Sequence, residues 1–138
     1  MSKPLRVLIV EDSEDDALLL MRELQRGGYT PAFERVETDE AMTAALEKQE
    51  WDAIIADYNL PVFSAPAALE LFKGTGLDLP FIVVSGAIGE ETAVAIMKAG
   101  AHDYLIKGNL TRLAAAVERE VKEAEVRKER KRAEEALK

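Results

Sequence analysis

Short hydrophobic runs recur along the chain and alternate with longer segments in which apolar residues repeat at helical spacing. The runs are the candidate strands: LRVLIV (5–10), AFERV (32–36), DAIIA (52–56), PFIVV (80–84) and DYLI (103–106). The first, third and fourth runs are almost wholly apolar, which is typical of central strands in a parallel sheet covered on both faces. The second and fifth runs include or adjoin charged residues, so they suit the edges of the sheet.

The segments between the runs carry the residues that begin and end helices. The predicted helix starts are Ser13, Thr38, Ser64, either Ala87 or Gly89, and Asn109. Gly27 with Gly28, and later Gly100, fall where helices are expected to end. The acidic residues Glu14, Asp15 and Asp16 are interpreted as partners of the helix dipole at the first of these starts.

This strict alternation with short connections predicts a single doubly wound, five-stranded parallel sheet flanked by five helices. With the second and fifth strands at the edges, the strand order is 2-1-3-4-5. That order reverses between the first and third strands, so a ligand crevice is expected at their carboxyl ends. We assign residues 1–122 to this domain and residues 123–138 to a charged extension of the fifth helix, or a linker.

Composition excludes several classes of function. The net charge of −8 argues against direct binding of nucleic acid, and the absence of cysteine excludes disulfides and thiolate zinc sites. No segment approaches the roughly 20 apolar residues of a membrane helix. The N-terminus turns acidic too soon for a secretory signal. A cytoplasmic protein without membrane insertion is therefore expected.

Chemically active residues follow the predicted strands. They are Glu11, Asp12, Asp57, Ser85, Gly86 and Lys107. Clustered carboxylates repel one another unless a cation joins them, and hard oxygen ligands favour Mg²⁺. Ser85 and Lys107 can hold the other oxygens of a phosphoryl group, and Asp57 is the natural nucleophile for an acyl phosphate.

Four motifs, VLIVED, DAIIADYNLP, PFIVVSG and AHDYLIK, occur in this order at the predicted strand ends. Together they resemble the signatures of bacterial two-component response-regulator receiver domains, the CheY-like superfamily, over about residues 4–122. The resemblance implies a flavodoxin-like fold with an extended C-terminal helix. It also implies a phosphorelay switch that is not a dedicated enzyme.

The resemblance further implies a role for each site residue. Asp57 accepts phosphoryl from a sensor histidine kinase or a phosphotransfer protein. Mg²⁺, or Mn²⁺, is held by Glu11, Asp12, Asp57 and the backbone carbonyl of Asn59. Ser85, Gly86 and Lys107 surround the phosphoryl group, and Tyr104 is the aromatic residue that switches with Ser85. The change passes to the face formed by residues 90–100, 103–106 and 110–121, where a homodimer can form.

The sequence departs from the family pattern in ways that keep every required chemical group. Gly108 replaces the proline that usually follows Lys107, so a trans peptide bond is expected there. Ala65 replaces a glycine before the third helix, and Ser85 replaces the commoner threonine. His102 is interpreted as a loop residue without ligand spacing, and Trp51 as a packing residue.

Residues 117–138 contain eight basic and seven acidic side chains, and no heptad pattern continues past Val121. A solvated helix held by i,i+4 ion pairs is the simplest interpretation. Two uses remain open, a linker helix to another module or a helix that dimerises. For the whole chain, the alternatives are an aspartyl-phosphate-type hydrolase of another α/β fold and a receiver-like docking module that is never phosphorylated.

Overall fold

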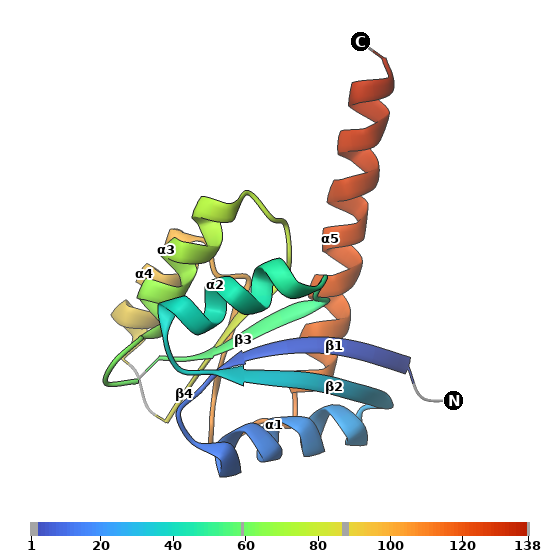
Figure 1. The fold of residues 1–138 in the computed structure, drawn as a ribbon. Helices are drawn as coiled ribbons and strands as arrows, with labels where there is room; N and C mark the ends of the chain where they lie inside the picture. Colours follow the sequence, from blue (N-terminus) through green and yellow to red (C-terminus); the bar gives the residue numbers. More distant parts are fainter. Residues whose placement is uncertain (1–2, 59, 87–88, 138) are drawn as a thin grey trace.

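The computed structural model describes residues 3–58, 60–86 and 89–137, and in them strands and helices alternate throughout (Figure 1). The elements are β1 (Lys3–Val10), α1 (Glu14–Arg26), β2 (Tyr29–Val36), α2 (Asp39–Lys48), β3 (Ala53–Asp57), α3 (Ala65–Thr75), β4 (Phe81–Ser85), α4 (Glu90–Ala99), β5 (Asp103–Ile106) and α5 (Leu113–Ala136). All the strand pairs are parallel, in the order β2-β1-β3-β4-β5. The predicted flavodoxin-like fold and strand order are confirmed.

Successive residues of each central strand point to opposite faces of the sheet and build two cores. In β1, Leu8 and Val10 belong to the core beneath α2, α3 and α4, whereas Val7 and Ile9 belong to the core shared with α1 and α5. Every residue of β3 and β4 is buried. Such strands must be apolar on both sides, which explains why their sequences read as continuous hydrophobic runs.

The first two helix starts are confirmed. The Ser13 hydroxyl accepts a hydrogen bond from the Asp16 amide (3.2 Å), and the Thr38 hydroxyl accepts one from the Ala41 amide (3.1 Å). Each bond satisfies an amide that has no partner inside its helix.

The later helix starts follow the prediction less closely. Ser64 precedes α3 without a side-chain cap, and Gly89 precedes α4, while Ala87 lies outside the described residues. The prediction for Asn109 was wrong, because α5 begins at Leu113. Asn109 instead belongs to a turn, in which its amide donates to the Ile106 carbonyl (2.8 Å).

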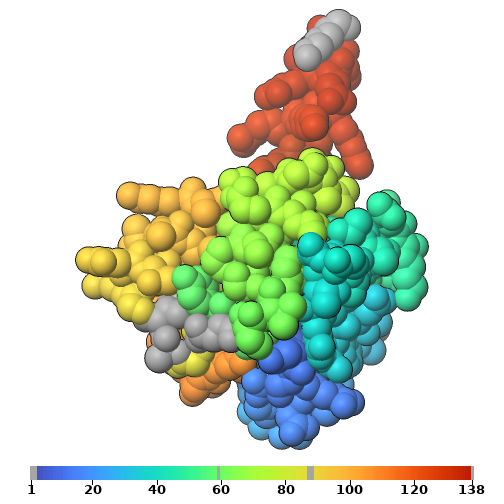
Figure 2. All heavy atoms as spheres, turned by 60° about the vertical axis from the view of Figure 1, so that its left-hand side comes forward, coloured from blue at the N-terminus to red at the C-terminus, as the bar shows by residue number. Residues whose placement is uncertain are grey.

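The long C-terminal helix is also confirmed. Near its start, α5 is tied to β5 by Arg119, whose guanidinium donates to the Asp103 carboxylate (2.8 Å). Further along, Arg127 donates from Nε and Nη2 to Asp78, in the loop before β4, at 2.8–3.1 Å. All of the side chains in residues 128–137 are exposed, and Figure 2 shows this end of α5 standing clear of the body.

The helix passes residue 122 without interruption, so the division of the chain there stays a prediction. Among the described helices, none combines the length and the hydrophobicity that a membrane span requires.

Gly27 marks a close approach between α1 and α5. A Cβ atom built on Gly27 would lie only 2.1 Å from Cβ of Ala114. Gly27→Ala should therefore force the two helices apart and lower the free energy of unfolding, measured by urea denaturation, by about 1–3 kcal/mol.

Two further variants control this experiment. Adding Ala114→Gly to Gly27→Ala should restore part of the stability. Gly74→Ala, at a helical position with no atom within 4 Å of the added Cβ, should leave the stability unchanged or raise it by about 0.5–1 kcal/mol. If Gly27→Ala is as stable as the unsubstituted protein, the close approach is contradicted.

Candidate functional site

Three carboxylates meet where β1 and β3 end, at the reversal of strand order. Glu11 and Asp12 follow β1, Asp57 ends β3, and one carboxylate oxygen from each lies within 4.8 Å of the others. Glu11 and Asp57 are buried, at 1% and 5% exposure, whereas Asp12 is exposed. Solvent therefore reaches the cluster beside Asp12. Asn59, the fourth predicted metal ligand, lies outside the described residues.

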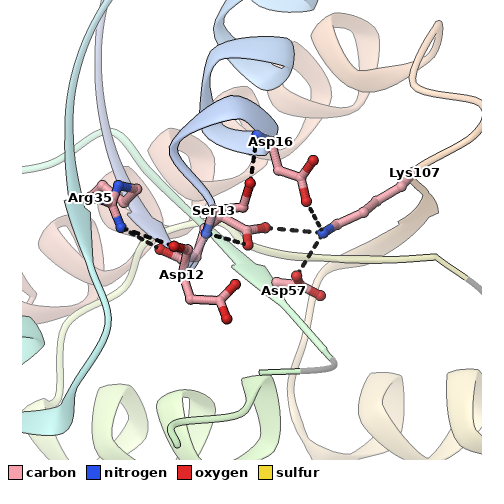
Figure 3. A network of polar contacts seen from close by, with 7 residues as sticks. Asp12, Ser13, Asp16, Arg35, Asp57 and Lys107 are labelled. Atoms are coloured by element: carbon pink, nitrogen blue, oxygen red, sulfur yellow. Dashed lines mark hydrogen bonds and ion pairs between the residues drawn. The ribbon is translucent and has the colours of Figure 1, made fainter. Parts of the chain in front are cut away.

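Lys107 follows β5, and its ammonium reaches the carboxylate cluster (Figure 3). The ammonium nitrogen lies 2.6 Å from Asp57 Oδ2, 3.1 Å from Glu11 Oε2 and 2.7 Å from Asp16 Oδ2. Burial disfavours the charged ammonium, but the three carboxylates outweigh burial and raise the pKa of Lys107. The side chain is therefore a fixed positive charge beside Asp57.

Asp16 is a member of this site that the sequence analysis missed. We interpreted it only as a partner of the helix dipole, yet its carboxylate accepts a hydrogen bond from Lys107. Its amide is held by Ser13, so the cap that begins α1 also fixes the backbone of Asp16. The sequence did contain a signal for this role: Asp16 follows Asp12 by four residues and lies in the first turn of α1, close to the strand ends.

Arg35 of β2 is a second residue whose role the sequence did not indicate. Its guanidinium donates to the backbone carbonyls of Glu11 (3.2 Å) and Asp12 (3.4 Å) (Figure 3). The same guanidinium also pairs with Glu37. The arginine thus holds the backbone segment that carries two of the three carboxylates. In the sequence, Arg35 is simply one of the charged residues that place the run 32–36 at an edge of the sheet.

The charged form of the Glu11 side chain is disfavoured in the folded protein. Burial first, and the neighbouring Asp57 carboxylate next, raise the pKa of Glu11 to about 7, against the opposing effects of the Ser13 amide and Lys107. A carboxyl group with a raised pKa holds its proton more tightly in the folded protein than in the unfolded chain.

A pH dependence of stability follows. In metal-free buffer, the contribution of Glu11 should be fully present below pH 4.5, its ordinary pKa, and should be lost as the pH rises through about 7. Urea denaturation with EDTA between pH 4.5 and 7.5 measures this. Glu11→Gln should flatten the profile, whereas Glu14→Gln at an exposed position should not; equal profiles for Glu11→Gln and the unsubstituted protein would contradict the effect.

The remaining predicted site residues lie around the next two strand ends. Ser85 ends β4 and is fully buried, and its carbonyl accepts a hydrogen bond from the Lys107 amide (2.7 Å). Gly86 is exposed, and a Cβ atom there would have no neighbour within 4 Å. Tyr104 is half-buried in β5 and lines an open cavity of about 510 Å³ with residues of α4, including Val94 and Met97.

Three expectations away from the carboxylates are met. None of the described peptide bonds is cis, in agreement with the expected trans bond before Gly108. Trp51 is a buried packing residue whose indole donates to the Ala45 carbonyl. His102 lies in the loop before β5, where its Nδ1 accepts a hydrogen bond from the Phe81 amide (2.9 Å).

The fold and this carboxylate cluster define a class of signalling domain, and the family comparison agrees. The family model of the response regulator receiver domain matches residues 7–118, so the chain belongs to this family. It is a receiver domain of two-component signalling and not a dedicated enzyme. Such domains act in general with histidine kinases, and an acidic cluster of this kind is typical of the receiver Mg²⁺ site.

Individual relatives differ in how much of their length the chain covers. The transcriptional regulatory protein PrrA of Mycobacterium tuberculosis is 35% identical over 102 residues, or 74% of this chain and 43% of PrrA. The chemotaxis protein CheY homolog of Campylobacter jejuni is 26% identical over 108 residues, or 75% and 81% of the two chains. A signal receiver domain from Vibrio parahaemolyticus is 28% identical, with a TM-score of 0.78 over 91% of this chain and 95% of that one. The chain thus spans less than half the length of PrrA.

Proposed function

We propose that this receiver domain is a phosphoacceptor switch in which Asp57 receives the phosphoryl group of a phosphohistidine on a sensor histidine kinase or phosphotransfer protein. The observation that carries the proposal is the pairing of buried Asp57 with Lys107, at 2.6 Å, inside a carboxylate cluster. An Asp57 oxygen forms a bond to phosphorus as the histidine nitrogen–phosphorus bond breaks, and the released imidazole takes up a proton. Phosphoryl transfer depends chiefly on positioning and on cationic stabilisation of the phosphoryl oxygens, and Lys107 supplies a cation at this position.

The residues present suit a divalent cation. Glu11, Asp12 and Asp57 offer hard oxygen atoms within 4.8 Å of one another, and exposed Asp12 leaves this oxygen cluster open to solvent on one side. These three residues would hold Mg²⁺ or Mn²⁺, with the Asn59 carbonyl as the fourth predicted ligand. The bound ion would neutralise charge on the phosphoryl oxygens.

The output is proposed to pass through Tyr104 to the α4-β5-α5 face. Lys107 is joined to Ser85 through its backbone, and Tyr104 lies three residues before Lys107 in the same strand and loop. The face exposes Val94, Met97 and Ile106 at 47%, 38% and 46%, which suits a protein partner or a second copy of this chain. The C-terminal helix is a second candidate surface for a homodimer, or a linker to another module.

The proposal is tested by phosphorylation with a small donor. The purified protein, incubated with Mg²⁺ and acetyl phosphate, should gain a labile adduct of about 80 Da, one phosphoryl group, in its intact mass. EDTA should prevent the adduct. If no adduct forms under conditions that label a known receiver domain, the proposal fails and the docking-module alternative is favoured. Repeated turnover of varied phosphomonoesters would instead favour the hydrolase.

A further inference from the structure

We propose that Asp16 is a positioning residue for phosphoryl transfer, whose carboxylate holds the ammonium of Lys107 beside Asp57. This inference rests on the proposed function and adds to it a residue from a different element. The two carboxylates come from α1 and β3, and Lys107 lies beyond β5, so the contact joins three separate parts of the fold.

The Lys107 ammonium contacts three carboxylates, and Asp16 and Asp57 make the two shortest of these contacts. Figure 3 shows Asp16 and Asp57 on opposite sides of the Lys107 nitrogen, which lies 2.7 Å from one carboxylate and 2.6 Å from the other. These are short distances for charge-assisted hydrogen bonds between an ammonium and a carboxylate. Because an ammonium has three N–H donors, one can serve Asp16 while the other two face Asp57 and Glu11, which lies 3.1 Å away.

Lys107 needs such an anchor because its side chain is long and its backbone is a loop. Fixing a lysine side chain costs on the order of 2 kcal/mol of rotamer entropy. When Asp57 is phosphorylated to an acyl phosphate, its carboxylate charge is lost to the new oxygen–phosphorus bond, and the attraction between Asp57 and the ammonium changes. Asp16 is not altered by the reaction. It therefore keeps the ammonium at the strand ends while negative charge moves onto the phosphoryl oxygens.

The anchor itself is well supported. The Asp16 amide is bonded to the Ser13 hydroxyl, and the Ser13 amide donates to Glu11 Oε1 (3.1 Å). The Asp16 side chain is 36% exposed and that of Lys107 is 26% exposed, so solvent weakens this contact only in part. In the same helical turn, Asp15 is exposed and forms no ion pair with Lys107 in the described parts of the chain. Asp15 therefore provides a control with the same charge and nearly the same place.

The experiment compares Asp16→Asn with Asp15→Asn at saturating Mg²⁺. Two quantities are measured: the rate of labelling by acetyl phosphate, and the affinity for beryllofluoride, a non-reacting substitute for the phosphoryl group, by calorimetry. Asp16→Asn should reduce both on the order of tenfold, the size expected for one charge-assisted contact that acts through another residue. Asp15→Asn should stay within about twofold of the unsubstituted protein, because the charge removed is equal but no contact is lost. Asp16→Glu, which keeps the carboxylate, should recover part of the loss.

A direct readout is the mobility of the lysine itself. NMR relaxation of the Lys107 Cε methylene should show a more mobile side chain in Asp16→Asn than in Asp15→Asn, with thermal unfolding confirming that both variants are folded. If Asp16→Asn matches Asp15→Asn in labelling and in Lys107 mobility while the unsubstituted protein labels normally, the positioning role is overturned and the proposed function stands. If the unsubstituted protein neither labels nor binds beryllofluoride, the proposed function itself fails.

Discussion

Replacing Asp57 by asparagine is expected to reduce the phosphoryl adduct to background, at least a hundredfold below the unsubstituted protein, on the order of the losses seen when a reacting nucleophile is removed. The amide keeps the size of the side chain and still offers an oxygen to Lys107, but it is not a nucleophile toward phosphorus. The other two carboxylates of the cluster are poor substitutes. Glu11 is fully buried and its pKa is raised to about 7, whereas Asp12 lies out in solvent.

The measurement is intact mass after incubation with Mg²⁺ and acetyl phosphate. Glu125→Gln, at an exposed position of α5 beside Trp51 and Asp78, removes one negative charge at the opposite end of the strands and should label normally. An undiminished adduct in Asp57→Asn would place the nucleophile elsewhere, and peptide mapping would then be directed first at Asp12.

Replacing Phe81 by alanine should cost about 3–5 kcal/mol in the free energy of unfolding. Phe81 begins β4, is completely buried, and packs its ring 5.7 Å from that of Phe72 in α3. The lost stability has two parts: the apolar surface of the ring is no longer buried, and a cavity remains between the sheet and α3. Because domains are typically stable by only 5–15 kcal/mol, this one change removes a large fraction of the total.

The matched control is Phe33→Ala. Phe33 belongs to the same sheet but is 39% exposed on the edge strand β2, so its truncation should cost about 1 kcal/mol or less. Urea denaturation of the two variants gives the comparison. Similar costs for Phe81→Ala and Phe33→Ala would show that the core beneath α3 tolerates a cavity.

The fold was predictable because burial constrains the sequence at every residue of a central strand. A strand such as β4, enclosed on both faces, requires an unbroken apolar run, and the charged residues of β2 are tolerated only at an edge. The residues brought together at the strand ends were predictable for a related reason. In a parallel sheet all the strands end on the same side, so Asp57 and Lys107 must meet near Glu11 whatever the details of the loops.

Other contacts depend on distances that no local pattern contains. Arg35 contacts the Glu11 carbonyl only because β1 and β2 pair with Ile9 opposite Arg35. The predicted start of α5 at Asn109 was wrong, because the Asn109 amide donates to the Ile106 carbonyl in a turn after β5. The helix therefore begins only at Leu113. The pairing of Arg127 with Asp78 spans 49 residues and requires the exact path of α5 past the loop before β4.

The pairing of Arg127 with Asp78 holds α5 at one point, so a rotation of the helix there would move its exposed C-terminal end. Beyond the Arg127 hydrogen bonds, the nine residues 128–136 continue for about 13 Å, at the usual rise of 1.5 Å per residue, and Lys128 and Arg132 line a cavity beside Arg6 and Leu77. Arg119 joins the same helix to Asp103, one residue before Tyr104, so a shift of β5 would act on the helix through this contact. A tilt of roughly 10° about the Arg127 attachment would move the tip by about 2 Å over this length. A small rotation of the helix near β5 would therefore displace its C-terminal end by a distance that could change its contacts with a partner.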